Sequence, residues 1–199
     1  DAKNAKENRK LFKDLYIEKS EYFKEHGQYP VIFISLKDLK KNTWEDAFFE
    51  LKALLREVYE EHSYIKEKLS DTEKEEYDKI LMKADDAEYG RALRNLTKYL
   101  HHYYQKEVVL LIDEYDNPLI VANTFNYYKD SINFFRDFFS TALKTNPYLK
   151  TAVLTGIVQV AKEGIFSGLN NVITYNILKD KFETFFGLSE EEVEEALEY

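Results

Sequence analysis

Two adjacent carboxylates, Asp113 and Glu114, follow the most apolar run of the sequence, residues 108–112. Such a run is typical of a strand buried in a parallel sheet, and ligands bind at the carboxyl ends of these strands. An Asp there can hold Mg²⁺, and the adjacent Glu can deprotonate a water that attacks a phosphoryl group. A solvated acidic turn after a strand has the same pattern, so the run alone leaves both interpretations open.

Thr155 is the second candidate, because it ends another short apolar run just before Gly156. In nucleotide hydrolases a polar residue at the end of the neighbouring strand contacts the γ-phosphate or the attacking water. Taken alone, Thr155 is better explained as the start of a turn. Thr155 is a candidate because it ends the next predicted strand after the one that precedes Asp113 and Glu114.

A phosphate-binding loop of the type G-x-x-x-x-G-K-[ST] is missing from the sequence, since none of its 6 glycines is followed by Lys. The backbone amides of such a loop hold phosphates, and its Lys reaches the β- and γ-oxygens. Histidine offers no substitute site: His101 and His102 are adjacent in a predicted helix and do not share a face. With no cysteine, Cys-ligated zinc and disulfides are excluded.

The candidate residues must be positioned by strands that alternate with helices. Apolar runs predict strands at 31–36, 108–112 and 151–155, and a fourth, short one at 172–175. Helical spacing predicts helices at 8–25 (with a possible break at 17–20), 43–62, 70–83, 85–103 and 131–145, and a last one capped by Ser189. A loop is predicted at Asn117-Pro118. This alternation indicates an α/β fold with a parallel sheet.

Composition narrows the function classes. The hydrophobic fraction of 44% is that of a globular domain. A net charge of −9 repels nucleic acid, so we expect no unspecific DNA or RNA binding by this segment. No run of about 18 apolar residues occurs and no secretion signal is visible, so we expect no membrane span and a cytoplasmic location.

Several motifs together resemble one family. Residues 108–118, VVLLIDEYDNP, resemble the second acidic motif of the bacterial AAA-ATPase-like family, whose members often carry a C-terminal PD-(D/E)XK nuclease-like domain. Residues 154–171, LTGIVQVAKEGIFSGLNN, resemble the block after the family's third strand, and 29–36 and 186–193 also fit. The resemblance covers about residues 9–199 and rests on the order and spacing of these motifs.

The resemblance implies a helix-rich α/β fold. It would be a parallel-sheet P-loop NTPase-like core with helices on both faces, whose first (P-loop) strand is missing from this chain. We expect a single core fragment over residues 1–199, with a helical insert at about 63–105 and the start of a C-terminal helical region at about 187–199.

The missing strand would lie in the middle of the sheet. We therefore expect the strands near 31–36, 108–112 and 151–155 to form an adjacent set. The segment 172–186 should be displaced, or the gap should be filled by another chain, because unpaired strand edges are unfavourable.

The resemblance also implies roles for individual residues. Asp113 would be the Mg²⁺-associated acid, Glu114 the catalytic base and Thr155 a sensor on the adjacent strand. Arg136 and Lys162 would be cations that face the phosphates. ATP and Mg²⁺ would be cofactors of the full-length protein, and we expect none to bind this chain alone.

Two departures from the family keep an alternative open. The family's P-loop, of the type RPRRFGKT, usually lies just upstream of a segment like residues 8–17, and the chain begins at Asp1 without Met, so we expect a fragment. Gln159 stands where members usually have a basic residue. The alternative is a non-catalytic scaffold or oligomerisation module, with self-association or the nuclease-like domain as partner. A phosphoacceptor role for Asp113 is disfavoured, because no acidic pair follows an earlier strand.

Overall fold

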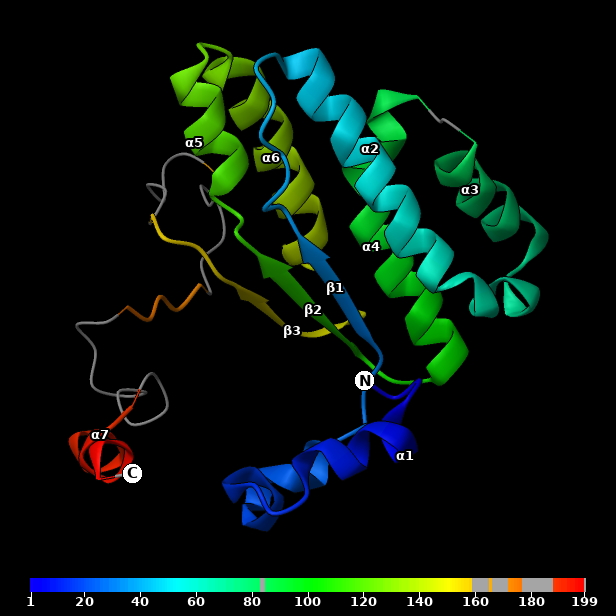
Figure 1. Cartoon of the computed structure of the whole chain (residues 1–199). Coiled ribbons are helices and arrows are strands. Elements are labelled where there is room, and N and C mark those ends of the chain that lie inside the picture. The colour runs from blue at the N-terminus through cyan, green and yellow to red at the C-terminus, as the bar shows by residue number, and fades with distance from the viewer. Residues whose placement is uncertain (83–84, 159–164, 166–171, 177–187, 199) are drawn as a thin grey trace. The chain divides into compact units, whose positions relative to one another are not determined.

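The computed structural model describes residues 1–82, 85–158, 165, 172–176 and 188–198. The chain divides into two units, Asp1–Leu169 and Asn170–Tyr199, and each is described by itself. The first unit contains a three-stranded parallel sheet of β1 (Val31–Ser35), β2 (Val108–Asp113) and β3 (Leu149–Leu154), in the order β1-β2-β3 (Figure 1). The predicted adjacency of these three strands is confirmed.

The register brings the carboxyl ends of the strands together. Ser35 of β1 pairs with Asp113 of β2, and Ile112 of β2 pairs with Leu154 of β3. Two backbone bonds extend the ladder past the strands: the amide of Leu36 donates to the carbonyl of Asp113, and that of Thr155 donates to the carbonyl of Ile112, both at 2.9 Å. Ser35, Asp113 and Thr155 therefore lie side by side at one edge of the sheet.

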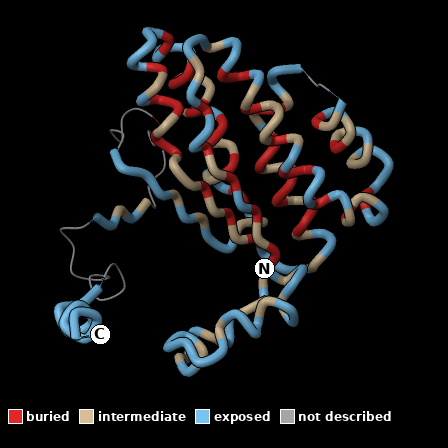
Figure 2. The backbone as a smooth tube through the Cα atoms, viewed as in Figure 1, coloured by how far each residue is buried: buried red, intermediate tan, exposed pale blue. Residues whose placement is uncertain are grey.

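Alternation along the strands separates two faces of the sheet, since successive side chains point to opposite sides. Ile32 and Ile34 are buried on one face, whereas Phe33 between them is 55% exposed. Its neighbour two strands away, Val153, is 49% exposed. Of the two helical layers expected, the described residues of the first unit provide one, which packs on the buried face (Figure 2).

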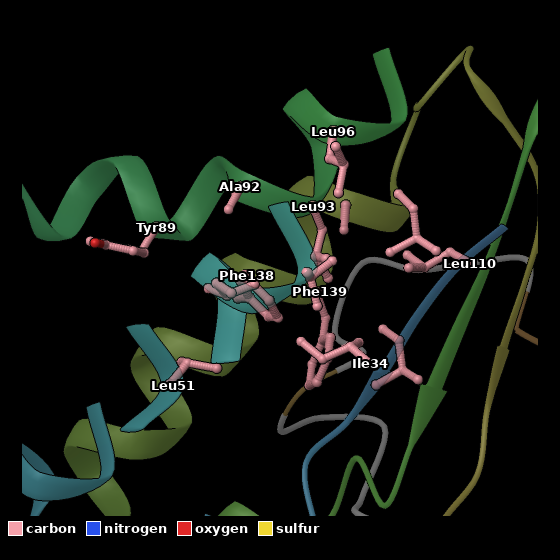
Figure 3. Packing of buried hydrophobic residues seen from close by; sticks show 14 of the residues in the cluster. Ile34, Leu51, Tyr89, Ala92, Leu93, Leu96, Leu110, Phe138 and Phe139 are labelled. Carbon is pink, nitrogen blue, oxygen red and sulfur yellow. The ribbon is translucent and has the colours of Figure 1, made fainter. Parts of the chain in front are cut away.

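Three long helices form this layer: α2 (Trp44–Glu61), α4 (Asp86–Tyr104) and α6 (Tyr128–Leu143). The Thr43 hydroxyl caps α2 by accepting from the amide of Asp46 at 3.2 Å, as predicted. Their apolar stripes meet the strands in one core, where Figure 3 shows Leu93 and Phe139 beside Ile34 and Leu110. Each such side chain stabilises the folded state by roughly 1.5–3 kcal/mol when it is buried instead of exposed.

The predicted insert contains η4 (Ser63–Lys68), α3 (Asp71–Leu81) and α4. A capping box of Ser70 and Glu73 begins α3, as the sequence predicts. Fully buried tyrosines join the helices: Tyr59 donates its hydroxyl to the carbonyl of Ala92 at 2.8 Å, and Tyr77 donates to the carbonyl of Tyr59. The helix α4 also packs on α6 and β2, so it is part of the main core.

The helix predicted at 8–25, with a possible break at 17–20, is wrong. The segment instead contains α1 (Ala5–Asn8) and three 3₁₀ turns, η1 (Arg9–Phe12), η2 (Tyr16–Lys19) and η3 (Glu21–Glu25). Two residues interrupt the helical backbone. Asp14 has a left-handed φ of 67°, and Ser20, the last residue of the possible break at 17–20, is extended. None of residues 1–29 is buried, so the apolar stripe has no packing surface that would stabilise a long helix.

Two further predictions need correction. The loop predicted at Asn117-Pro118 is the start of α5 (Asn117–Thr124), because Pro is well accommodated in a first helical turn. The strand predicted at 172–175 is wrong, since residues 172–176 have no regular structure. A strand requires a ladder partner, and none is described for these residues.

The second unit contains α7 (Glu190–Leu197), which begins at Ser189 with a capping box, as predicted. No residue of α7 is buried. Among the described residues of the whole chain, no helix combines the length and apolar character needed to span a membrane.

Candidate functional site

Asp113 lies between hydroxyl groups from both neighbouring strands. The Thr155 hydroxyl donates to Asp113 Oδ1 at 2.6 Å, and the Ser35 hydroxyl donates to Asp113 Oδ2 at 3.1 Å. Ser35 is the last residue of β1 and Thr155 directly follows β3, so the parallel register alone places all three together. The two predicted residues Asp113 and Thr155 are in direct contact.

These hydrogen bonds favour the ionised form of Asp113. The Thr155 hydroxyl has the largest effect and lowers the pKa of Asp113 below its ordinary value, while burial opposes it. The hydroxyl of Ser35, the amide of Glu114 and the positive charge of Lys37 lower the pKa further. At neutral pH the site therefore presents a carboxylate, which is the form that ligates a cation.

Glu114 occupies a strained backbone conformation directly beside Asp113. Its φ of 51° lies in the left-handed region, which costs a non-glycine residue about 1 kcal/mol. Strand β2 ends one residue earlier, so the chain turns sharply at this point. The Glu114 side chain is half-buried, and its carboxylate has no hydrogen bond or ion pair within the described residues. Such a carboxylate can accept a proton from a bound water.

Asp116 joins the loop after β2 to the loop after β3. It is 2% exposed, and its Oδ2 accepts from the amides of Ile157 at 2.9 Å and Val158 at 2.6 Å. The amide of Tyr115 donates to the carbonyl of Thr155 at 3.0 Å, and the Tyr115 hydroxyl donates to the carbonyl of Val158 at 3.2 Å. Four hydrogen bonds therefore connect residues 115–116 to residues 155–158.

Asn117 makes the corresponding connection to the end of β1. Its side-chain amide donates to the carbonyls of Leu36 and Lys37, both at 3.0 Å. Sequence reasoning missed Ser35, Asp116 and Asn117. Ser35 could have been found by the same rule that selected Thr155, a polar residue that closes an apolar run.

The two predicted phosphate-facing cations, Arg136 and Lys162, have no described contact with Asp113 or Thr155. Arg136 lies half-buried on α6, and the cation whose charge acts on Asp113 is Lys37. Lys162 and Gln159 lie outside the described residues. The predicted phosphate contacts of Arg136 and Lys162 therefore stay predictions.

The residues present fit a magnesium ion held jointly with a phosphate. Asp113 offers carboxylate oxygens, the hard ligands that Mg²⁺ prefers, and Mg²⁺ often takes only one or two carboxylates besides water and phosphate. The described part of the chain has no group of three or more acidic, His or Cys side chains that could hold a metal without further ligands. The site thus suits a metal–nucleotide complex better than a metal bound by protein alone.

Comparison with known proteins agrees with this chemistry. Residues 1–166 match a family model, AAA-ATPase-like, which is described as a predicted AAA-ATPase. No curated protein and no solved structure matches the chain. The matched range contains Ser35, Asp113, Glu114, Asp116 and Thr155.

Proposed function

Because the chain belongs to the AAA-ATPase-like family of predicted AAA-ATPases, we propose that it carries the metal-binding and water-activating half of a site that hydrolyses ATP. The observation that carries this proposal is the position of Asp113, ionised between the hydroxyls of Ser35 and Thr155, with the carboxylate of Glu114 beside it. These groups stand where the carboxyl ends of parallel strands present ligands.

In the proposed reaction, a water oxygen attacks the γ-phosphorus of ATP. The Glu114 carboxylate accepts a proton from this water, the bond from the γ-phosphorus to the bridging oxygen breaks, and ADP leaves with the electron pair. Asp113 would hold Mg²⁺ through a carboxylate oxygen, and the metal when bound would neutralise phosphate charge. Ser35 and Thr155 orient Asp113 by donating one hydrogen bond to each of its oxygens.

The phosphate anchor must come from elsewhere in the full-length protein, since this sequence contains no Gly-Lys dipeptide. The outer edge of β3 supports this part of the proposal, because the described sheet leaves it unpaired next to Thr155. A further parallel strand could pair there and deliver a phosphate-binding loop to the same edge of the sheet.

Calorimetric titration of ATP–Mg²⁺ tests where the nucleotide binds. We expect no binding to this chain, and micromolar or tighter binding to a version extended upstream through a phosphate-binding loop. Absence of binding to both proteins would contradict the proposed function.

Replacement of the base tests the chemistry in the extended protein. Glu114→Gln should preserve ATP binding and lower kcat by about 10²–10⁴, since general base catalysis contributes that much. The control is Glu57→Gln, an exposed acid on α2, which should leave kcat unchanged. Hydrolysis is measured as phosphate release under saturating ATP.

The second candidate function is a scaffold or oligomerisation module that retains the fold without the chemistry. The lack of a phosphate-binding loop in this sequence favours it. It predicts that Glu114→Gln leaves every activity of the full-length protein intact, and that no nucleotide binds. A loss of activity in this variant would exclude the scaffold reading.

A further inference from the structure

We propose that Asp116 is a positioning residue: its buried carboxylate fixes the loop of residues 155–158, and thereby holds the Thr155 hydroxyl on Asp113. This inference rests on the proposed function for its catalytic consequence. We call the hydrogen bonds from the amides of Ile157 and Val158 to the Asp116 carboxylate the brace. The brace lies within the first unit and does not depend on nucleotide binding.

The loop after β3 is not held by apolar burial. Ile157 is 92% exposed and Val158 is 49% exposed, and Thr155 and Gly156 are also exposed. An exposed loop of this kind ordinarily samples many conformations, because little burial opposes its conformational entropy. Thr155 is held by hydrogen bonds to Ile112, Asp113 and Tyr115, and the described attachments of residues 157–158 are hydrogen bonds to Tyr115 and Asp116.

Asp116 provides the strongest of these attachments. One oxygen, Oδ2, accepts from two successive amides, those of Ile157 and Val158. Hydrogen bonds to a charged acceptor are stronger than those between neutral groups. No salt bridge to Asp116 is described, so these amides carry the stabilisation of a carboxylate that is 2% exposed.

Gly156 allows the close approach that the brace needs. A Cβ at this position would lie 2.5 Å from Asp116 Oδ1 and 2.9 Å from Tyr115 Cε1. Both separations are shorter than any van der Waals contact, so a larger residue would push the loop away from Asp116. Thr155, Gly156 and Asp116 thus act as one unit, in which the glycine provides room and the carboxylate provides the bonds.

The consequence for the site follows from the position of Thr155. Its backbone is fixed by Ile112 and Tyr115, and the next residues by Asp116. With both flanks fixed, the hydroxyl can stay within 2.6 Å of Asp113 Oδ1 without burial of the threonine. Loss of the Asp116 carboxylate should release the far flank and lengthen this contact.

Amide hydrogen exchange, measured by NMR on the chain without nucleotide, tests the brace directly. In Asp116→Ala, exchange at Ile157 and Val158 should rise by about tenfold or more, since two hydrogen bonds are lost. Asp116→Asn, whose carbonyl oxygen can still accept both amides, should stay closer to wild type. The control Asp137→Asn changes an exposed acid on α6 and should have no effect. Unchanged exchange in a folded Asp116→Ala protein would overturn the proposal.

If Asp116→Ala does not fold, Gly156→Ala tests the same contact from the opposite side. It should raise exchange at Ile157 and Val158, because the added Cβ displaces Asp116. A folded Gly156→Ala protein with wild-type exchange at both amides would overturn the proposal.

The catalytic consequence is tested by a double-mutant cycle in the extended, ATP-hydrolysing protein. Asp116→Ala should lower kcat with little change in KM for ATP, and adding it to Thr155→Val should lower kcat no further. Additive losses would show that Asp116 does not act through Thr155. If the wild-type protein hydrolyses no ATP, the proposed function fails, whereas the exchange result still decides the brace.

Discussion

His62 illustrates how a single buried group sets the response of the protein to acid. It lies at the end of α2, is 6% exposed, and its Nδ1 is 3.4 Å from the Tyr64 hydroxyl. Burial, with a smaller contribution from the positive charge of Lys3, lowers the pKa of His62 to about 4. The neutral imidazole is therefore the native form throughout the physiological range.

The sign of the pH effect follows from this direction. A histidine whose pKa is lower in the folded state binds fewer protons there than in the unfolded chain, so its contribution is complete above about pH 6.5 and is lost as pH falls towards 4. We expect His62→Gln to flatten the decline of unfolding free energy between these values by about 2 kcal/mol. Urea unfolding at several pH values measures the unfolding free energy of both proteins across this range. His26→Gln, a half-buried histidine of the first segment, is the control.

Single residues of the site differ in how far sequence can reveal them. Asp113 and Thr155 could be predicted because each closes an apolar run, and parallel register brings such residues together. Asp116 could not, since its partners are the backbone amides of Ile157 and Val158, which any residue type would supply. The predicted roles of Glu114 as base and Asp113 as metal ligand still await measurement.

Among the elements, α3 and α4 are joined by a charged side chain at a helix start. Glu73 caps α3 and also receives a hydrogen bond from Lys98 of α4 at 2.9 Å, with His102 Nδ1 3.4 Å away. Burial alone would raise the pKa of Glu73, but the bonds from Lys98 and Ser70 outweigh it and lower the pKa to about 2. One carboxylate thus stabilises both the start of α3 and its packing on α4.

Removal of this charge should destabilise the protein in a pH-dependent way. A carboxyl group with a lowered pKa stabilises the folded state above its unfolded pKa of about 4.5, and this contribution is lost as pH falls towards 2. Glu73→Gln should therefore lower the unfolding free energy at pH 7 by about 2 kcal/mol, with the difference shrinking below pH 4. The control is Glu75→Gln, which changes an exposed glutamate on the same helix. Thermal melts should show no such pH-dependent loss of stability for this variant. An equal loss at pH 7 and pH 3 would contradict the argument.

Elements were predictable where packing and local pattern agree. The three strands and the helices α2, α3, α4 and α6 each have a buried apolar stripe or a capping residue that the sequence displays. The predicted helix at 8–25 failed because periodicity does not reveal whether a surface exists to cover the stripe. The helix α5 was missed because Asn-Pro is common in loops and equally suits a first helical turn.

At the scale of the whole molecule, the hydrophobic core belongs entirely to the first unit. Every buried residue in the described part of the chain lies between Pro30 and Ile165, and none lies in α7. The composition predicted a globular core, and the order of strands predicted its sheet. The core could not be divided between units from the sequence, because residues 170–199 contain as many apolar positions as an ordinary packed segment.

A chain ending at residue 169 should therefore fold on its own. We expect its unfolding free energy to lie within about 1 kcal/mol of that of the 199-residue chain, because none of the described residues after 169 is buried. Thermal unfolding followed by near-ultraviolet circular dichroism measures the comparison. A chain ending at residue 148, which lacks β3, is the matched control and should lose cooperative unfolding. Loss of cooperativity on cutting at 169 would show that residues 170–199 contribute to the core.

The left-handed backbone of Glu114 has a consequence for laboratory evolution. Glycine would adopt its φ of 51° at lower cost and relieve about 1 kcal/mol of strain. A library screened only for heat resistance should therefore enrich glycine at this position and discard the proposed base. A library screened for turnover should keep glutamate and tolerate the strain. The residue recovered at 114 would thus report which of the two pressures the screen applied.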